Sequence, residues 1–200
     1  MIFTYYIINR LVFRNSFHKV DIVSNFIKQI SKKTIFDKIF KMSFIIRLAS
    51  KKDMQSVLDL IIELAIFEKK PDAVTITVDD LVQDGFSKTP KFIVFVAEED
   101  NNIIGIALFY ERYSTWKGRT IHLEDLIVTK RKQKIGAGKA LYSAVLKYAY
   151  DNNFNRVAWE VIDWNTNAID FYKSTGATYL NDWSVVQMNK KNLEKFIQDS

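Results

Sequence analysis

Cysteine is absent from the chain, and histidine and proline each occur only twice in 200 residues. Without cysteine the protein cannot form disulfides, thiolate zinc sites or a cysteinyl acyl-enzyme, so its chemistry must come from oxygen and nitrogen groups. His18 and His122 are the only histidines, and no serine elbow accompanies them, so a hydrolase triad is not indicated and we expect no metal. A cysteine-free chain fits a reducing compartment, and we expect a cytoplasmic protein.

Long apolar runs are also missing, because none approaches the roughly 18 to 20 residues that span a bilayer. Apolar residues nevertheless make up 48% of the chain, which is enough for one sizeable core at this length. We therefore expect a soluble protein of the α/β (α+β) class with one main domain and no membrane span.

Acidic residues are scarce only near the N-terminus. The chain has 29 Lys/Arg and 23 Asp/Glu; eight and two of these lie in residues 1–41, which leaves 21 of each in residues 42–200. The net charge of +6 therefore belongs to the leader, and the body gives no reason to expect nucleic-acid binding. We predict a basic extension at residues 1–41, outside the main fold, and a main domain at residues 42–200.

Four interpretations of the leader stay open. The segment "MSFIIRLAS", from Met42, reads as a natural first strand and favours a non-native or mis-assigned start upstream. Apolar residues at helical spacing between Val23 and Ile30 favour an accessory helix. An organelle-targeting or membrane-surface segment and a nucleic-acid arm are the other two. A secretory signal fits poorly, because Arg10 and Arg14 interrupt the apolar run.

Hydrophobic periodicity in the body predicts the order βαα, βββ, αβαββ. Helices are expected at residues 51–69, 77–86, 139–153 and 166–176, and the second should begin with a capping box between Thr77 and Asp80. Strands are expected at residues 44–48, 91–99, 103–113, 120–129, 155–162, 177–181 and 184–189. This order predicts a mixed, mostly antiparallel sheet of six to seven strands with helices on both faces.

Two of the six glycines stand one residue apart in "QKIGAGKAL" (133–141), between an apolar strand and a helix. Bare backbone at a helix start binds phosphate, because free amide N–H groups and the helix dipole point at the anion. A dinucleotide fingerprint does not fit, because Leu141 replaces its third glycine. A nucleoside-triphosphate loop does not fit either, because Gln133 replaces its first glycine. Close helix packing stays open as the non-functional explanation.

A second motif, "WNTNAIDFYKSTGA" (164–177), places Ala168, Ile169 and Tyr172 on one face of a helix. Tyr172 is then either a core aromatic with its hydroxyl at the rim or a general acid. A phenol, whose ordinary pKa is about 10, is protonated at pH 7 and can give its proton to a departing thiolate.

A third motif, "HLEDLIV" (122–128), places Glu124 and Asp125 in an otherwise apolar strand. Strict alternation would put these residues on two faces, with His122, Glu124 and Leu126 on one and Leu123, Asp125 and Ile127 on the other. Buried carboxylates are costly unless they are paired or used, so a salt bridge or a sheet-edge position is one explanation. The other is a base for an alkyl ammonium, whose pKa of about 10 prevents attack until it loses a proton. Glu124 is the first candidate for this base and Asp125 the second.

The pattern Q/R-x-x-G-x-G/A at residues 133–138, the motif at 164–177 and the order of elements over about residues 44–190 resemble the GCN5-related N-acetyltransferase (GNAT) superfamily. The resemblance implies the GNAT fold and a loop whose amides hold the pyrophosphate of acetyl-CoA. It implies that Asn165 hydrogen-bonds the pantetheine arm, that Tyr172 is the general acid and that an amide near Val128 polarises the thioester oxygen. The implied acetyl-CoA contacts are Leu126, Val128, Gln133, Lys134, Ile135, Gly136, Ala137, Gly138, Lys139, Asn165 and Tyr172.

Further motifs, "ELAIFEK", "DLVQDGF", "YSTWKGRTIHLEDLIV" and Asp182-Trp183, resemble the diamine acetyltransferase family, especially its thialysine N-epsilon-acetyltransferase branch. This resemblance implies a homodimer, and an amine pocket lined by Glu68, Trp116, Glu124 and Asp125. In the polyamine-acetylating branch an acid stands two residues before the tryptophan. This chain has Ser114 there, so a lysine-like amino acid is favoured over spermidine.

We therefore predict that residues 42–200 are an acetyl-CoA-dependent N-acetyltransferase domain. It would transfer acetyl directly to the primary amine of a small lysine-like or diamine substrate. The alternatives are a CoA-binding regulatory protein of the same fold without turnover, and an acetyltransferase that acts on a protein or peptide amine. One departure bears on acetyl-CoA binding: Lys134 stands where glycine is frequent, and it would disturb the loop if that position needs a positive φ.

Overall fold

The structure is a computed structural model that describes residues 44–199, in two compact units, 44–157 and 158–199. The extension at residues 1–41 lies outside the described residues, so the predicted domain boundary stays a prediction. The elements in chain order are β1 (Ile45–Leu48), η1 (Lys51–Asp53), α4 (Met54–Phe67), α5 (Val78–Gly85), β2 (Ile93–Glu99), β3 (Asn102–Ser114), β4 (Gly118–Val128), η2 (Lys130–Lys132), α6 (Ala137–Asp151), β5 (Val157–Ala158), α7 (Thr166–Ser174) and α8 (Lys190–Gln198).

The sheet has the strand order β1-β2-β3-β4-β5, and β1 to β4 pair with their neighbours in antiparallel fashion. The chain next to β5 pairs with β4 through two bonds, Asn155 N–H to the Arg119 carbonyl at 3.0 Å and Ile121 N–H to the Arg156 carbonyl at 2.9 Å. Residue numbers rise together across these bonds, as in parallel pairing. The predicted mixed, mostly antiparallel sheet is confirmed, with five strands instead of six or seven.

The missing strands are the last two. Residues 177–181 and 184–189 form no strand in the described chain, and the strand expected at 155–162 is reduced to the two residues of β5. Large apolar side chains in this C-terminal segment are exposed, among them Trp183, Val185, Val186 and Met188. A strand needs a partner strand as well as apolar alternation, and no strand of the described residues pairs with this segment.

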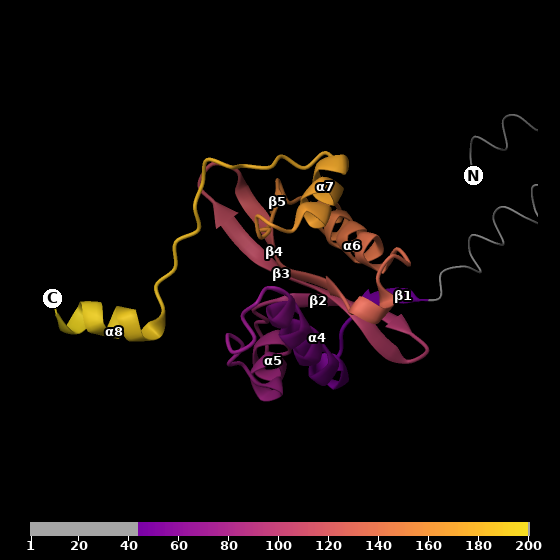
Figure 1. Cartoon of the computed structure of the whole chain (residues 1–200), viewed down its shortest axis with the longest axis horizontal. Coiled ribbons are helices and arrows are strands. Elements are labelled where there is room, and N and C mark those ends of the chain that lie inside the picture. The colour runs from indigo at the N-terminus through magenta and orange to yellow at the C-terminus, as the bar shows by residue number, and fades with distance from the viewer. Residues whose placement is uncertain (1–43, 200) are drawn as a thin grey trace, which may run out of the picture. The chain divides into compact units, whose positions relative to one another are not determined.

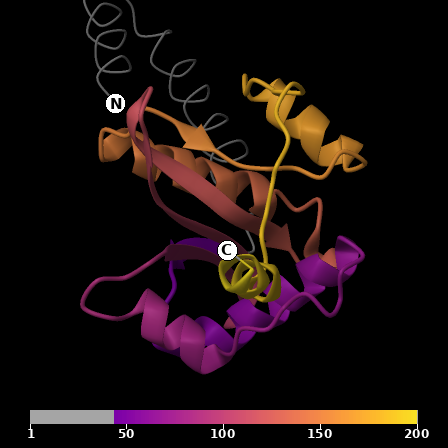
Figure 2. The ribbon, with the colours of Figure 1, turned by 90° about the vertical axis from the view of Figure 1, so that its left-hand side faces the viewer.

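Helices cover both faces of the sheet in the first unit, as predicted (Figures 1 and 2). On one face α4 and α5 pack on alternate residues of β2, β3 and β4 and form a core of Met54, Val57, Leu60, Leu81, Val94, Val96, Ile106, Leu108 and Ile127. On the other face lies α6, whose Tyr148 contacts Phe109 edge-on with ring centroids 5.1 Å apart. The two faces therefore have separate apolar contacts.

The N-terminal ends of α4 and α5 are fixed by hydrogen bonds to side-chain oxygens. Thr77 and Asp80 form the predicted capping box of α5, with 3.2 Å from the Asp80 amide to Thr77 Oγ1. At the other helix, Arg47 of β1 donates to both Asp53 oxygens at 2.8 and 3.0 Å and also pairs with Glu98 of β2. The guanidinium holds the pKa of the Asp53 carboxyl well below its usual range. This network ties the start of α4 to the sheet.

Candidate active site

A β-bulge in β4 determines where the two candidate bases lie. Leu108 of β3 pairs with Asp125 and Phe109 pairs with Leu123, so Glu124 is an extra residue without a partner in β3. Leu108 belongs to the core under α4, whereas Phe109 contacts α6 on the other face. Asp125 therefore lies on the α4 face and Leu123 on the α6 face.

This bulge overturns the strict alternation that the sequence predicted for residues 122–127. The imidazole Nε2 of His122 lies 3.4 Å from a Glu124 carboxylate oxygen, so these two side chains do share a side. Leu126, however, pairs with Ala107 on the α6 face and is separated from them. The inserted residue brings Glu124 and Asp125 toward the same face, where alternation would have separated them.

Three acids gather at this point of the α4 face. Glu68 is half-buried at the C-terminal end of α4, and its charge acts on Asp125 together with that of Glu124. Burial, followed by the charges of Glu124 and Glu68, raises the pKa of Asp125 to about 6. The Glu124 side chain is 51% exposed and can be reached from solvent. Neighbouring carboxylates repel one another, so each one raises the cost of ionising the others. A bound cation offsets this repulsion, and the cluster therefore attracts one.

We expect Asp125→Asn to stabilise the fold near neutral pH. Because the carboxyl has an ordinary pKa near 3.9 in the unfolded chain and about 6 in the folded one, its buried charge costs folding free energy above pH 4, and this cost is complete above pH 6. The variant should gain about 2 kcal/mol at pH 7.5 and almost nothing at pH 4. Urea unfolding at the two pH values measures the difference.

Asp72→Asn is the matched control, because Asp72 is exposed and lies in the turn after α4. Its unfolding free energy should stay within about 0.5 kcal/mol of the wild-type value at both pH values. A loss of stability for Asp125→Asn at pH 7.5, or an equal gain at both pH values, contradicts the assignment of a buried, uncompensated carboxylate.

The glycine-containing loop forms an exposed turn ahead of α6. Gly136 is the N-cap of α6 with φ of 93°, and Ala140 is the first residue whose N–H reaches back to the Gly136 carbonyl, at 3.0 Å. The amides of Ala137, Gly138 and Lys139 therefore precede the regular helical pattern and are available to an anion. A Cβ on Gly138 would lie 3.7 Å from Val128, so the loop and the end of β4 are adjacent, as the predicted acetyl-CoA contacts require.

Glu63 and Gln133 hold the chain between β4 and this loop. A Glu63 carboxylate oxygen of α4 accepts the Lys130 amide at 2.8 Å and the Thr129 hydroxyl at 3.2 Å. Gln133 turns back and donates to the Val128 carbonyl at 3.3 Å. The loop is therefore anchored to α4 and to β4, which also carry the acid cluster.

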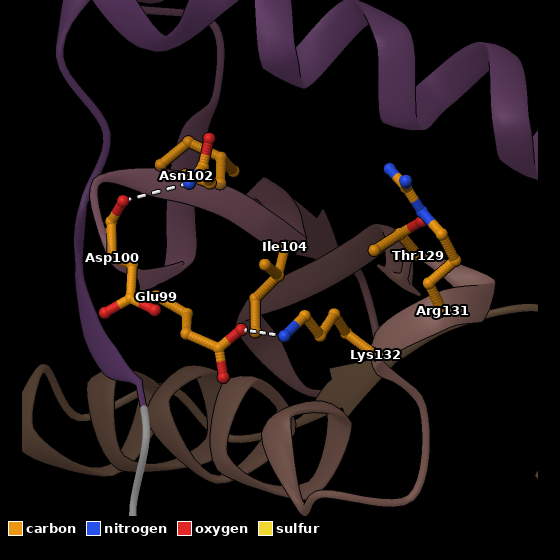
Figure 3. A pocket seen from close by; sticks show the side chains of 8 residues that line it. Glu99, Asp100, Asn102, Ile104, Thr129, Arg131 and Lys132 are labelled. Carbon is orange, nitrogen blue, oxygen red and sulfur yellow. Dashed lines mark hydrogen bonds and ion pairs between the residues drawn. The ribbon is translucent and has the colours of Figure 1, made fainter.

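A pocket of about 390 Å³ lies beside this chain segment, next to the turn between β2 and β3 (Figure 3). Lys132 points toward Glu99 and forms an ion pair with it, whereas Arg131 points away from that pair. The pocket lining is Glu99, Asp100, Asn102, Ile103, Ile104, Thr129, Arg131 and Lys132. Its two acidic and two basic side chains balance in charge, and the Lys132–Glu99 ion pair links η2 to the end of β2.

Lys134 adopts the left-handed backbone conformation, with φ of 66°. Glycine reaches this conformation at no steric cost, whereas another residue pays roughly 1 kcal/mol. We therefore expect Lys134→Gly to be about 1 kcal/mol more stable than Lys134→Ala, since both variants lose the charge and only one relieves the strain. Urea unfolding compares them. Equal stability of the two variants would show that the turn relaxes around a side chain at no cost.

The second unit contains Asn165 and Tyr172. Asn165 is the N-cap of α7, and its Oδ1 accepts the Ala168 amide at 3.2 Å, so it has a structural role in addition to the predicted contact with the pantetheine arm. Tyr172 is half-buried, with its ring 5.0 Å from that of Trp159 and 5.4 Å from that of Phe171. These contacts orient the phenol ring within its unit.

Trp116 is not near the acid cluster of its own chain. It is 77% exposed in the turn between β3 and β4. The six residue steps from Gly118 to Glu124 place that turn about 20 Å along the strand from the bulge. Ser114 closes the turn by accepting the amides of Trp116 and Lys117 at 3.3 and 3.2 Å. The assignment of Trp116 to the amine pocket stays a prediction.

His122, Glu63 and the bulge have no predicted role in the sequence motifs. His122 is 8% exposed, and its Nδ1 is a buried nitrogen without a hydrogen-bond partner among the described residues. Only the unusual pair of adjacent acids hinted at an irregular strand. Within residues 44–199 no three or more His, Asp or Glu side chains are arranged so that they could hold a metal ion together. No helix there has the length and apolarity to cross a membrane.

The model of the acetyltransferase (GNAT) family matches residues 57–177. Thialysine N-epsilon-acetyltransferase of Bos taurus is 38% identical over 150 residues, which cover 70% of this chain and 88% of that protein. The integron cassette protein VCH_CASS6 of V. cholerae has a similar fold, with a TM-score of 0.65 and 23% identity over 78% of this chain and 99% of its own. The aminoglycoside N-acetyltransferase AAC(6')-Iy in complex with CoA has a TM-score of 0.58 and 18% identity, over 74% and 95% of the two chains.

These matches define a GNAT-type acyltransferase, with the glycine-containing loop and the acid-bearing strand inside the matched region. The chain belongs to the GNAT family of N-acetyltransferases, and the resemblance to thialysine N-epsilon-acetyltransferases is confirmed. The fold class predicted from the sequence is confirmed as well.

Proposed function

We propose that this acetyltransferase uses acetyl-CoA and transfers the acetyl group directly to the primary amine of a small lysine-like or diamine substrate. The observation that carries the proposal is the cluster of Glu68, Glu124 and Asp125 on one face of the sheet. Among residues 44–199 no basic group contributes to the pKa shift of Asp125, which comes from burial and the two neighbouring carboxylates. An alkyl ammonium supplies the missing positive charge.

The loop before α6 supports the acetyl-CoA half of the proposal. Its exposed backbone offers amides at a helix N-terminus, and Gly136 supplies the positive φ that the turn needs. We assign Gln133, Lys134, Ile135, Gly136, Ala137, Gly138 and Lys139 to pyrophosphate binding, and Leu126, Val128, Asn165 and Tyr172 to the thioester and its pantetheine arm.

The transfer needs three proton movements, two away from the amine nitrogen and one to the departing thiolate. The amine nitrogen loses a proton toward Glu124 through water and attacks the thioester carbonyl carbon, forming the new C–N bond. The amide of Val128 polarises the carbonyl oxygen. The C–S bond then breaks, and Tyr172 gives its proton to the departing thiolate. As the amide forms, the nitrogen gives its second proton to solvent. Glu124 then ends protonated and the phenol ionised; Glu124 releases its proton to solvent and the phenolate takes one back, so one proton is released for each ammonium acetylated.

The amine is proposed to be lysine-like because the position of a second acid is occupied by Ser114. The Ser114 hydroxyl already accepts the two turn amides. A second ammonium of the substrate would therefore find no carboxylate at this position. Discrimination between amines then falls to the acids around the bulge, which can attract one ammonium strongly.

A homodimer is part of the proposal. The exposed apolar side chains of the C-terminal segment include Val185, Val186 and Met188. Such a surface favours an interface, and a second copy of the chain would bury it. A cytoplasmic location and the absence of nucleic-acid binding stay predictions from composition.

A panel of amines tests the substrate class. Initial rates of CoA release are measured with thialysine, lysine, putrescine, spermidine and an α-amino peptide under identical conditions. We expect kcat/KM for thialysine to exceed that for spermidine at least tenfold. A rate that is highest for the peptide would replace the small-amine proposal with a protein substrate.

A further inference from the structure

His122 lies beside the proposed base and is unexplained by the chemistry above. It stands in β4 two residues before Glu124, opposite Tyr110 of β3, and the two rings lie 5.2 Å apart. The imidazole is enclosed, since the side chain is only 10% exposed. One nitrogen, Nε2, lies 3.4 Å from the Glu124 carboxylate, and the other, Nδ1, has no partner in the part of the chain that is described.

These two environments decide which nitrogen carries the proton. A proton on Nδ1 would leave a buried donor without an acceptor and would turn the Nε2 lone pair toward a carboxylate. A proton on Nε2 instead faces the carboxylate, and Nδ1 then remains a buried acceptor, which proteins tolerate more often than an orphaned donor. The 3.4 Å separation is slightly longer than an ordinary hydrogen bond, as catalytic contacts often are before substrate binds.

We propose that His122 is a positioning residue that holds the Glu124 carboxylate in place through its Nε2–H group. Glu124 needs such a restraint, because it is the inserted residue of the bulge and its side chain is half-exposed. A mobile carboxylate would be in line with the amine for only part of the time, and misplacement of a reacting group is costly. The proposal rests on the proposed role of Glu124 as proton acceptor.

The tautomer can be measured without any turnover. The chain has only two histidines, so the His18→Gln variant labelled with ¹⁵N-histidine shows the signals of His122 alone. At pH 8 we expect the proton on Nε2 and a bare Nδ1, and we expect Glu124→Gln to shift the Nε2 signal. A proton on Nδ1, or an Nε2 signal that ignores Glu124→Gln, overturns the proposal. Because no substrate is present, failure of acetyl transfer to any amine is a separate result.

Three replacements separate positioning from packing. Glutamine can place an N–H donor near the Nε2 position, asparagine only near the Nδ1 position, and phenylalanine keeps only the ring. We expect His122→Gln to retain kcat within about threefold, and His122→Asn and His122→Phe to lose about 10- to 10²-fold, with KM for acetyl-CoA nearly unchanged. Full activity of His122→Phe, or equal losses in all three, contradicts the proposal. Thermal unfolding checks that each variant folds, and the asparagine variant serves if the phenylalanine variant does not.

Discussion

Replacing Tyr172 by phenylalanine is expected to lower kcat by about 10- to 10³-fold and to leave the affinity for acetyl-CoA nearly unchanged. The phenol proton is needed only when the C–S bond breaks, so its loss removes an interaction of the transition state and spares the ground state. The ring contacts with Trp159 and Phe171 are kept, because phenylalanine has the same ring. Steady-state CoA release gives kcat, and calorimetric titration with acetyl-CoA gives the affinity.

Tyr179→Phe is the matched control, since it removes a hydroxyl from an exposed tyrosine in the same unit. Its kcat should equal that of the wild type. If Tyr172→Phe also keeps the wild-type kcat, Tyr172 is a packing residue and the departing thiolate takes its proton from another group.

The second large effect is expected for Glu124→Gln. Without the carboxylate the amine must arrive already deprotonated, so kcat/KM for the amine should fall about 10²- to 10³-fold at pH 7. The remaining rate should then follow the fraction of free amine and rise about tenfold per pH unit toward the ammonium pKa of about 10. A pH profile of kcat/KM from pH 7 to 9.5 measures both the loss and this recovery.

Glu160→Gln removes an exposed carboxylate elsewhere in the chain and should leave the profile unchanged. Asp125→Asn tests the runner-up. If Asp125→Asn shows the large loss and Glu124→Gln only a small one, the two acids exchange roles, and the buried acid is the base.

Most of the first unit could be predicted from the sequence because its periodicity is regular. The capping box of Thr77 and Asp80 and the long strands β2 to β4 follow from local patterns that the fold does not override. The C-terminal strands could not be predicted correctly, since apolar alternation at residues 184–189 says nothing about whether a backbone partner is present.

The site was predictable in composition but not in geometry. The residues "HLEDLIV" indicate acids for amine chemistry, but the adjacent acids only hint at an irregular strand and do not locate the bulge. Strict alternation therefore placed Leu126 with Glu124 and put Asp125 on the opposite face, whereas the register shows the reverse. Likewise, "QKIGAGKAL" predicts an anion loop, whereas the positive φ of Lys134 appears only in the folded turn. The orphaned nitrogen of His122 depends on three-dimensional burial and had no counterpart in spacing.

The central claim is direct acetyl transfer from acetyl-CoA to a small amine, and one mass-spectrometric measurement tests it. The full chain is incubated with acetyl-CoA, first alone and then with thialysine, and the masses of protein, CoA and amine are followed. We predict an unmodified chain throughout, and N-acetylated thialysine together with an equal amount of free CoA only after the amine is added. Bound acetyl-CoA that is never consumed, for thialysine or for any other amine of the panel, would contradict it.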